Sequence, residues 1–256
     1  MTKYLEDAKI IESKPLSSDV NILKVYAPNI VKEAKPGQFV NVEVTKQVAP
    51  LLRKPLGVAD VDITTGILTL IYRILGEGTK VLASLKVGEV ININGPLGHG
   101  FSLHAKKPLI VGGGCGLAPL IYLAKKLCPK PIDLLMGGRN QEELFWTEFY
   151  KDTCGEIFIT TDDGSVGTKG TVMALLPELL STGGYDYVYV CGPEPMMKAV
   201  SAACEKSQIP CQVSLEKYMA CGIGACLSCS CGGKNNRRLK VCQHGPVFLS
   251  TELEEW

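Results

Sequence analysis

The stretch Pro108-Leu-Ile-Val-Gly-Gly-Gly-Cys-Gly-Leu-Ala-Pro119 predicts how the middle of this 256-residue chain folds. Its first apolar residues favour a short strand, its glycines favour a tight turn, and the apolar residues that follow favour a helix through Leu127. Together these form the dinucleotide-binding arrangement, because glycine lets the backbone approach a pyrophosphate and the helix N-terminus faces its charge. The candidate nucleotide-binding residues are Gly112, Gly113, Gly114 and Gly116.

Two features depart from the usual form of this arrangement. Pro119 stands in place of the third glycine. The next expected strand, over residues 132–136, is followed by Gly137-Gly-Arg139, where an NAD-binding Rossmann fold carries an acidic residue. An ordinary Rossmann site for FAD or NAD is therefore not expected here.

Expected strands and helices alternate further along the chain, with strands over residues 157–160 and 187–190. This alternation predicts a parallel sheet whose ligands sit at the carboxyl ends of the strands. The loop at residues 161–170 and the segment Cys191-Gly-Pro193 lie at such ends, beside the glycine turn. Each is also typical of a plain strand-to-helix turn. Three loops on one edge favour a nucleotide site that includes Cys191, Gly192 and Pro193, within an α/β domain over residues 102–210.

The chain before this domain is rich in short apolar stretches separated by glycine and proline turns. Strands are expected over residues 8–15, 20–27, 38–44, 67–74 and 90–93, with a helix at 78–85. Short strands at this spacing predict a small closed barrel. The first domain is therefore expected to be an all-β barrel over residues 1–101.

Two stretches of the barrel carry candidate chemistry. Arg53-Lys-Pro-Leu56 is one, and Ile71-Tyr-Arg73, followed by Gly78 and Thr79 at a helix start, is the other. An arginine beside a strand and a glycine at a helix N-terminus can clamp a pyrophosphate, and a tyrosine beside them can cover an aromatic ring. A surface Arg-Lys pair and a capped helix remain the alternative reading of these residues.

Four cysteines define the C-terminal segment, expected as a separate domain over residues 211–256. Cys221, Cys226 and Cys229 have the C-x4-C-x2-C spacing, and Cys242 follows after a gap. This is the plant-type ferredoxin pattern, in which four thiolates hold a 2Fe-2S cluster. A zinc site or buried free thiols are the alternatives, although structural zinc sites usually show paired short spacings. Cys231 is a spare thiol outside this spacing.

Composition limits the remaining possibilities. A formal net charge of +1 gives no support for a nucleic-acid or membrane-surface role. The N-terminus has no apolar targeting region, and no apolar run reaches membrane-spanning length. The 11 cysteines indicate metal or redox chemistry in a reducing compartment. A cytoplasmic location is expected, with small molecules and proteins as partners.

The order of the barrel, glycine turn, Thr161-Asp-Asp-Gly-Ser165 and Cys191-Gly-Pro-Glu-Pro-Met196 resembles the ferredoxin-NADP reductase superfamily across nearly the whole chain. With Cys221-Gly-Ile-Gly-Ala-Cys-Leu-Ser-Cys229 and Val241-Cys-Gln-His-Gly-Pro-Val-Phe248, it is similar to the electron-transfer subunits of type B dihydroorotate dehydrogenases.

The resemblance implies three cofactors and one partner: FAD in the barrel, NAD in the α/β domain, a 2Fe-2S cluster on the four cysteines, and an FMN-containing catalytic subunit, with two copies of each subunit. That partner would oxidise dihydroorotate in pyrimidine biosynthesis, and electrons would pass through the cluster and FAD to NAD. No side chain of this chain would then need to act as a general acid or base. Carried over by position, the FAD-binding residues are Arg53, Lys54, Pro55, Leu56, Ile71, Tyr72, Arg73, Gly78 and Thr79.

Two positions depart from the family pattern. The family usually has arginine where Lys54 stands and serine where Gly57 stands. Lysine keeps the charge but loses the forked donor. Glycine offers the flavin only its backbone groups. The reduction potential of the flavin is therefore expected to differ from that in the rest of the family.

Two other functions fit the same residues. The chain could serve another NAD(P)H-linked complex that feeds ferredoxin or reduces sulfur, because an arginine at position 139 can hold a 2′-phosphate in related reductases. It could also be a flavin-free adaptor that docks electron carriers without being an enzyme.

Overall fold

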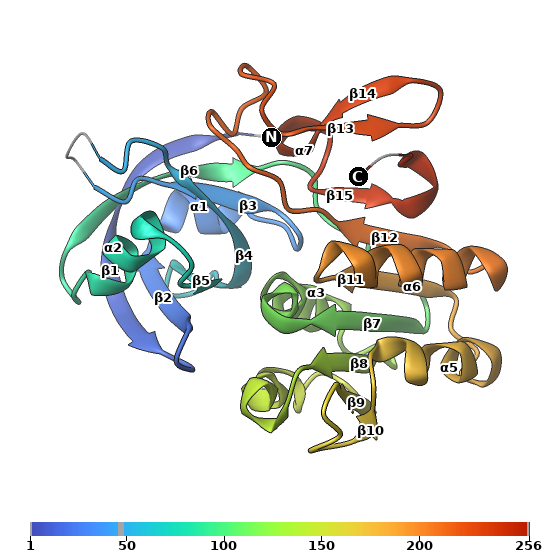
Figure 1. Ribbon diagram of the computed structural model, residues 1–256. Coiled ribbons are helices and arrows are strands. Elements are labelled where there is room, and N and C mark those ends of the chain that lie inside the picture. Colours follow the sequence, from blue (N-terminus) through green and yellow to red (C-terminus); the bar gives the residue numbers. More distant parts are fainter. Residues whose placement is uncertain (1, 46–48, 255) are drawn as a thin grey trace.

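The computed structural model describes residues 2–45, 49–254 and 256. A closed barrel lies beside a layered α/β domain, and the C-terminal segment lies next to both (Figure 1). The expected combination of an all-β barrel and a parallel-sheet domain is thereby confirmed. None of the helices in the part of the chain described here is long and apolar enough to span a membrane.

The barrel closes in the strand order β1-β2-β5-β4-β3-β6. Its elements are β1 (Tyr4–Pro15), β2 (Val20–Tyr26), α1 (Pro28–Glu33), β3 (Phe39–Val42), β4 (Lys54–Asp62), β5 (Ile67–Arg73), α2 (Glu77–Ser84) and β6 (Val90–Leu97). Side chains that alternate along the strands, such as Val40 and Val42 on β3, are fully buried in the barrel core.

Sequence analysis missed β4 and α1. Pro55 and Gly57 lie in the first half of β4, and both residues are ordinarily depleted in strands. They are tolerated because both pair with β3, whereas β4 pairs with β5 only from Val58 onward.

The second domain is a seven-stranded sheet in the order β10-β9-β8-β7-β11-β12-β15. Its elements are β7 (Pro108–Gly113), η1 (Gly114–Leu117), α3 (Ala118–Leu127), β8 (Asp133–Gly138), η2 (Gln141–Trp146), α4 (Thr147–Tyr150), β9 (Ile157–Thr161), β10 (Thr168–Lys169), η3 (Val172–Ala174), α5 (Leu176–Thr182), β11 (Tyr187–Cys191), α6 (Glu194–Lys206), β12 (Cys211–Ser214) and β15 (Val247–Leu249). All neighbouring strands are parallel except β12 and β15.

Two hydrophobic cores cover the two faces of this sheet. On β11, Tyr187 and Tyr189 point into the core that α3 covers, and Val188 and Val190 point into the core that α6 covers. A strand buried on both faces must be apolar throughout, which explains why this segment was recognisable in the sequence.

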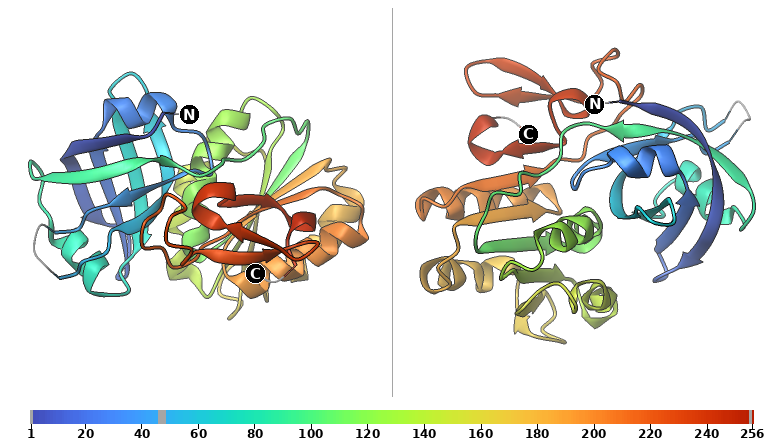
Figure 2. Two further views of the ribbon diagram at one scale, coloured as in Figure 1. Left: turned by 90° about the horizontal axis from the view of Figure 1, so that it is seen from above. Right: turned by 180° about the vertical axis from the view of Figure 1, so that it is seen from behind.

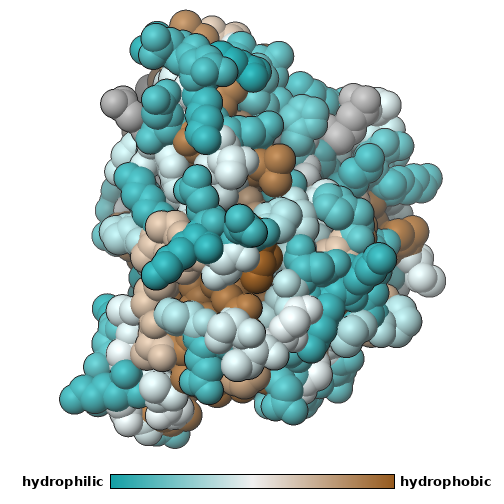
Figure 3. All heavy atoms as spheres, turned by 90° about the vertical axis from the view of Figure 1, so that its right-hand side faces the viewer, coloured by the Kyte–Doolittle hydropathy of each residue, from teal (hydrophilic) through white to brown (hydrophobic). Residues whose placement is uncertain are grey.

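On the side of the molecule that lies to the right in Figure 1, most surface atoms are hydrophilic and hydrophobic ones gather in the middle (Figure 3).

The C-terminal segment leaves the sheet and returns to it. β12, which sequence analysis placed in the third domain, pairs in parallel with β11, and β15 then pairs with β12. Between them lie the cysteine loop, β13 (Ser230–Gly233), β14 (Arg237–Lys240) and α7 (Val241–His244), and η4 (Ser250–Glu252) follows β15. β12 therefore belongs to the sheet of the second domain, although it follows the expected domain boundary at residue 210. Val213 of β12 is buried, and it pairs with β11.

Direct contacts join the barrel to the sheet. A Cβ atom on Gly57 of β4 would lie 3.3 Å from Pro119 Cβ in the first turn of α3. Tyr122 donates its hydroxyl to Ala34 O at 3.2 Å. Figure 2 shows the C-terminal segment against both domains, and Asn41 Nδ2 of β3 donates to Cys221 O at 3.5 Å. The three expected cofactor regions are therefore neighbours in the fold.

Candidate functional site

The two predicted nucleotide-binding turns meet at the carboxyl edge of the sheet. A Cβ atom on Gly116 would lie 2.5 Å from Cys191 O and 2.5 Å from Gly192 N. One on Gly192 would lie 3.1 Å from Gly113 N. The chain crosses over between β7 and β11, and ligands of such sheets bind at this crevice. Glycines 112, 113, 114 and 116 and the segment 191–193 are thus brought together, and only glycine permits that approach.

Pro119 explains the departure from the usual glycine pattern. In the ordinary arrangement, the third glycine allows the helix to pack closely on its strand. Here the proline lies in the first turn of α3, where its missing N–H costs nothing, and it packs against Gly57 of the barrel. The position has become part of the interface between the two domains.

Arg73 lies between the barrel and the glycine turn. Its Nε is 3.1 Å from Asp19 Oδ2, and its Nη2 is 3.5 Å from Glu143 Oε1 in the α/β domain. Its Nη2 also lies 3.9 Å from where a Cβ of Gly114 would be. This residue, expected at the FAD, therefore also reaches the edge of the nucleotide turn.

Lys54 is the cation that faces the start of α2. A Cβ on Gly78 would lie 2.1 Å from Lys54 Cε and 3.2 Å from its Nζ, so the lysine stem crosses the first turn of that helix. Among the described residues, no acceptor lies within hydrogen-bonding distance of Lys54 Nζ. The side chain of Thr79 accepts hydrogen bonds from Leu75 N and Gly76 N. The backbone N–H groups at Gly78 and its neighbours have no helical acceptors.

An unpaired cation at a helix N-terminus is electrostatically unfavourable, because the helix macrodipole is positive at that end. An anion placed between Lys54 and the N–H groups of the first turn of α2 would remove the conflict. The residues present therefore fit the phosphate groups of a dinucleotide such as FAD.

Arg53 is hydrogen-bonded to two strands of the barrel. Its Nη1 donates to Asn41 O at 3.3 Å and Asn92 O at 3.1 Å, and its Nη2 donates to Asn92 Oδ1 at 2.7 Å. Because these bonds tie the guanidinium to β3 and β6, Arg53 holds the barrel together. That Arg53 clamps the pyrophosphate stays a prediction, and these bonds make Lys54 the better placed of the two cations.

Tyr72, expected beside the flavin, lies inside the barrel. Its side chain is 3% exposed in the barrel core, and its hydroxyl accepts a hydrogen bond from Asn21 Nδ2 at 3.1 Å. Burial raises the pKa of this hydroxyl to about 12. Its burial in the core does not favour a ring that covers a flavin, and that role stays a prediction. Ile71 is likewise buried, on the side facing the sheet, and Pro55 and Leu56 lie at the start of β4.

The cysteine loop is shaped around the sulfur of Cys221. The backbone N–H groups of Ile223, Ala225 and Cys226 all point to this sulfur, at 3.4, 3.3 and 3.4 Å. Gly222 and Gly224 have φ of +68° and +89°, which allows the loop to turn its N–H groups inward. Three donors directed at one sulfur suit a thiolate that ligates iron.

Cys229 and Cys242 lie next to each other beneath this loop. Each is 2% exposed, and Cys242 N donates to Cys229 Sγ at 3.4 Å. Burial raises the pKa of Cys242 to about 12, and the neighbouring thiols of Cys229 and Cys221 add to this rise. Cys226 is exposed, and its Sγ lies 3.1 Å from Ser228 Oγ, a hydrogen bond that contributes most to lowering the pKa of Cys226 to about 6.

Within the described ranges, no three His, Cys, Asp or Glu side chains converge on a single metal ion. Cys231 lies on β13 opposite Leu239, and His244 Nδ1 accepts a hydrogen bond from Lys240 N at 2.8 Å. Neither residue belongs to the cysteine loop.

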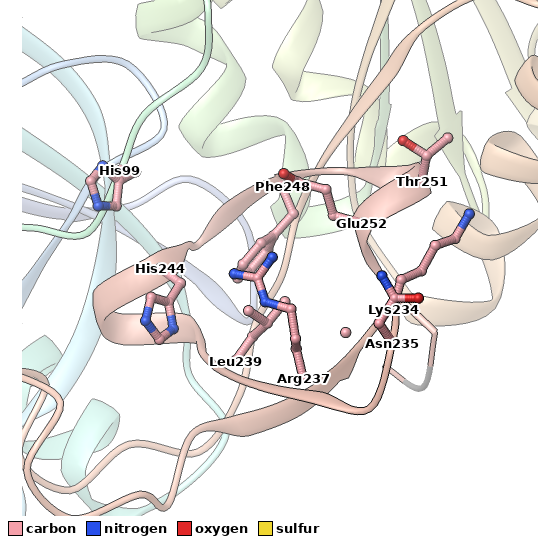
Figure 4. Close-up of a pocket in the computed structure, with 10 residues that line it drawn as sticks. His99, Lys234, Asn235, Arg237, Leu239, His244, Phe248, Thr251 and Glu252 are labelled. Carbon is pink, nitrogen blue, oxygen red and sulfur yellow. The ribbon is translucent and has the colours of Figure 1, made fainter.

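A basic pocket beside the β13–β14 hairpin was not anticipated. It has a volume of about 410 Å³, and four of its lining side chains are His99, Lys234, Arg237 and His244 (Figure 4). Because these residues come from three separate segments, no local sequence pattern predicts this pocket.

Two carboxylates near the nucleotide turns were also missed. Glu143 contacts Arg73, as described above, and Glu216 follows β12. Burial raises the pKa of Glu216. Burial also raises the pKa of Cys115 and that of Cys191, and the charge of Glu216 adds to both rises. The only sequence signal for Glu143 was its spacing of four residues from Arg139.

Comparison with known families assigns each region. The model described as the iron-sulfur cluster binding domain of dihydroorotate dehydrogenase B matches residues 216–254. The oxidoreductase FAD-binding domain matches residues 7–101, and the oxidoreductase NAD-binding domain matches residues 110–202. The expected FAD, NAD and iron-sulfur cofactors are therefore confirmed at the level of domains.

A solved structure of the NADH-dependent reduced ferredoxin-NADP oxidoreductase is similar to this chain, with a TM-score of 0.88 and 30% identity over 97% of this chain and 90% of that one. The ferredoxin reductase of carbazole 1,9a-dioxygenase shares the fold, with a TM-score of 0.67 and 23% identity over 82% of this chain and 68% of that one.

Curated relatives match this chain over nearly their whole length. The dihydroorotate dehydrogenase B (NAD(+)) electron transfer subunit of Caldanaerobacter subterraneus is 38% identical, covering 96% of this chain and 97% of the relative. That of Fusobacterium nucleatum is 39% identical, covering 98% of both chains. On this evidence, the chain belongs to the family of dihydroorotate dehydrogenase B electron-transfer subunits.

Proposed function

We propose that this chain transfers electrons between a dihydroorotate-oxidising catalytic subunit and NAD. The observation that supports it is the continuity of its three cofactor regions. Cys221 of the cysteine loop contacts Asn41 on β3, and β3 pairs with β4. β4 in turn contacts α3 through Gly57 and Pro119, directly after the glycine turn. Short contacts of this kind suit electron transfer across one chain.

When bound, the iron-sulfur cluster supplies one-electron transfer, and FAD converts between one-electron and hydride transfer. The chain's own residues hold and orient these groups. Cys221, Cys226, Cys229 and Cys242 are the proposed ligands of a 2Fe-2S cluster. Lys54 and the first turn of α2 neutralise phosphate charge, and the glycine turns let a nucleotide approach the sheet. No side chain is required as a general acid or base.

The proposed partner contains FMN and assembles with this chain as two copies of each subunit, in the cytoplasm. The cysteine loop offers a suitable contact surface, because Cys226 is exposed and large hydrophobic side chains lie around it. Tyr218 is 95% exposed, and Ile223 and Leu227 are about half exposed at 49% and 52%. Apolar groups exposed next to a redox centre are typical of a protein interface.

The test separates the two halves of the electron path. The isolated chain, loaded with its cofactors, should reduce an artificial acceptor with NADH but should not oxidise dihydroorotate. Adding the catalytic subunit should restore dihydroorotate-dependent NAD reduction, and Cys226→Ser should abolish that reaction while NADH-to-acceptor transfer continues. Dihydroorotate-dependent NAD reduction that survives loss of the cluster would rule out this path.

A second candidate function is electron transfer within a ferredoxin-linked complex. The similarity to the NADH-dependent reduced ferredoxin-NADP oxidoreductase, at 30% identity, favours it. The two candidates differ in the protein that copurifies with this chain. A flavoprotein with dihydroorotate activity supports the first, and reduction of ferredoxin by the purified complex supports the second.

A further inference from the structure

Arg139 occupies the position that distinguishes NAD from NADP in nucleotide-binding sheets. It follows β8, the strand next to β7 with its glycine turn. In doubly wound sheets the nucleotide's ribose lies near the end of this second strand. There an acidic residue binds the 2′-hydroxyl of NAD, or a nearby arginine binds the 2′-phosphate of NADP. By sequence position alone, Arg139 would favour NADP.

The structure shows that this arginine is already engaged. Arg139 Nε donates to Glu143 Oε1 at 2.7 Å, and Nη2 of the same guanidinium lies 2.5 Å from that oxygen. The backbone N–H of Arg139 donates to Glu143 Oε2 at 2.9 Å. Both carboxylate oxygens are therefore used to hold this one residue, and the Nε and Nη2 groups of the guanidinium face Glu143.

Glu143 is also held from the other side. Arg73 Nη2 approaches its Oε1 at 3.5 Å, and the side chain of Glu143 is only 15% exposed, compared with 68% for Arg139. The carboxylate is thus fixed by two guanidinium groups, and its position depends on the contact between barrel and sheet.

Further negative charge surrounds Arg139. Asp162 N donates to Gly138 O at 3.1 Å and Asp163 N donates to Arg139 O at 3.3 Å, so the loop after β9 packs against the Arg139 backbone. The charges of Glu143, Asp19 and Asp162 act on Arg139, so this corner of the molecule has three carboxylates and the two guanidinium groups of Arg73 and Arg139. A 2′-phosphate, which carries about two negative charges, would be repelled there.

We propose that Glu143 is a specificity-determining residue that makes this chain select NAD over NADP. It withdraws Arg139 from the ribose position and adds negative charge to it. The ribose diol of NAD is uncharged and can donate to a carboxylate, whereas a 2′-phosphate can only accept. This inference rests on the NAD-linked function proposed above and assigns its cofactor choice to one side chain.

The test compares Glu143→Gln with Glu142→Gln as the matched control. Glu142 is the adjacent, exposed residue of the same turn, and within the described chain its carboxylate has no hydrogen-bond partner. The FAD-loaded chain is assayed with an artificial acceptor and either NADH or NADPH. Glu143→Gln should raise the ratio of kcat/KM for NADPH to that for NADH by about tenfold, the effect of one charge-assisted bond gained. Glu142→Gln should leave the ratio unchanged.

A binding measurement gives a readout that does not need flavin. By titration calorimetry, Glu143→Gln should bind 2′-phospho-AMP about tenfold more tightly than the wild-type chain does, with AMP as the reference ligand. If the variant loses FAD, this titration alone decides. Adding Arg139→Ala to Glu143→Gln should cancel the gain, because the freed guanidinium is then missing.

The inference is overturned if the affinity of Glu143→Gln for 2′-phospho-AMP stays within about twofold of the wild type, or if the gain persists in the double variant. Failure of the wild-type chain to accept electrons from NADH would be a different result. It would refute the proposed function and not the role of Glu143.

Discussion

Replacing Lys54 by methionine is expected to weaken FAD binding while slightly stabilising the flavin-free chain. Methionine keeps an unbranched stem across Gly78, where Lys54 Cε lies 2.1 Å from the position of an added Cβ, but removes the ammonium group. In the flavin-free state that ammonium has no acceptor among the described residues and lies at the positive end of α2. Removing it should therefore relieve a repulsion.

The two effects can be sized separately. A hydrogen bond from a charged group to phosphate contributes about 1.5–3 kcal/mol, so the Kd for FAD should rise about 10-fold to 100-fold. A cation at the wrong end of a helix costs about 0.3–1 kcal/mol, so Tm of the flavin-free chain should rise by about 1–4 °C. Fluorescence titration of the flavin-free chain with FAD and thermal unfolding measure the two quantities.

Two further variants give the contrast. Arg53→Met should lower Tm, because it breaks the bonds to Asn41 and Asn92 that join β3 and β6. Lys80→Met on the exposed face of α2 should change neither quantity appreciably, because the Lys80–Glu77 pair is exposed and such pairs contribute little. If Lys54→Met keeps the wild-type Kd for FAD, or if Arg53→Met loses FAD without a fall in Tm, the assignment of the phosphate-binding cation to Lys54 is wrong.

Three more outcomes are expected. Cys229→Ser should remove most of the iron and Cys231→Ser should retain it, as measured by metal content; the reverse result would exchange their roles. Gly116→Ala should destabilise the chain by about 1–3 kcal/mol in denaturant unfolding, because its Cβ would lie 2.5 Å from Cys191 O; an unchanged midpoint would mean that the turn can move. The pKa of Glu143 is lowered in the folded chain by its hydrogen bonds and charge interactions with Arg139, which outweigh burial. Its contribution to stability should therefore be complete above its usual pKa of 4.5 and lost as the pH falls through the lower folded value, and Glu143→Gln should flatten that part of the stability curve.

The sequence by itself determined the elements whose pattern is local. β7 and β11 are buried on both faces, so each is an unbroken apolar run that stands out without knowledge of its neighbours. The glycine turn and the spacing of Cys221, Cys226 and Cys229 were recognisable because the backbone near a ligand restricts which residues can occupy each place. These short-range constraints were sufficient to identify the family.

Tertiary structure alone decided which charged groups are free to act. Arg53 and Lys54 are adjacent in sequence and chemically alike, but Arg53, just before β4, donates to Asn41 and Asn92, whereas Lys54, the first residue of β4, lies against α2. In the sequence, Tyr72 was a candidate for covering the flavin ring, but its side chain is buried in the closed barrel. Side chains on neighbouring positions of a strand point to opposite faces, so their partners depend on which strands lie alongside. Those partners come from residues distant in the sequence, and no local pattern encodes them.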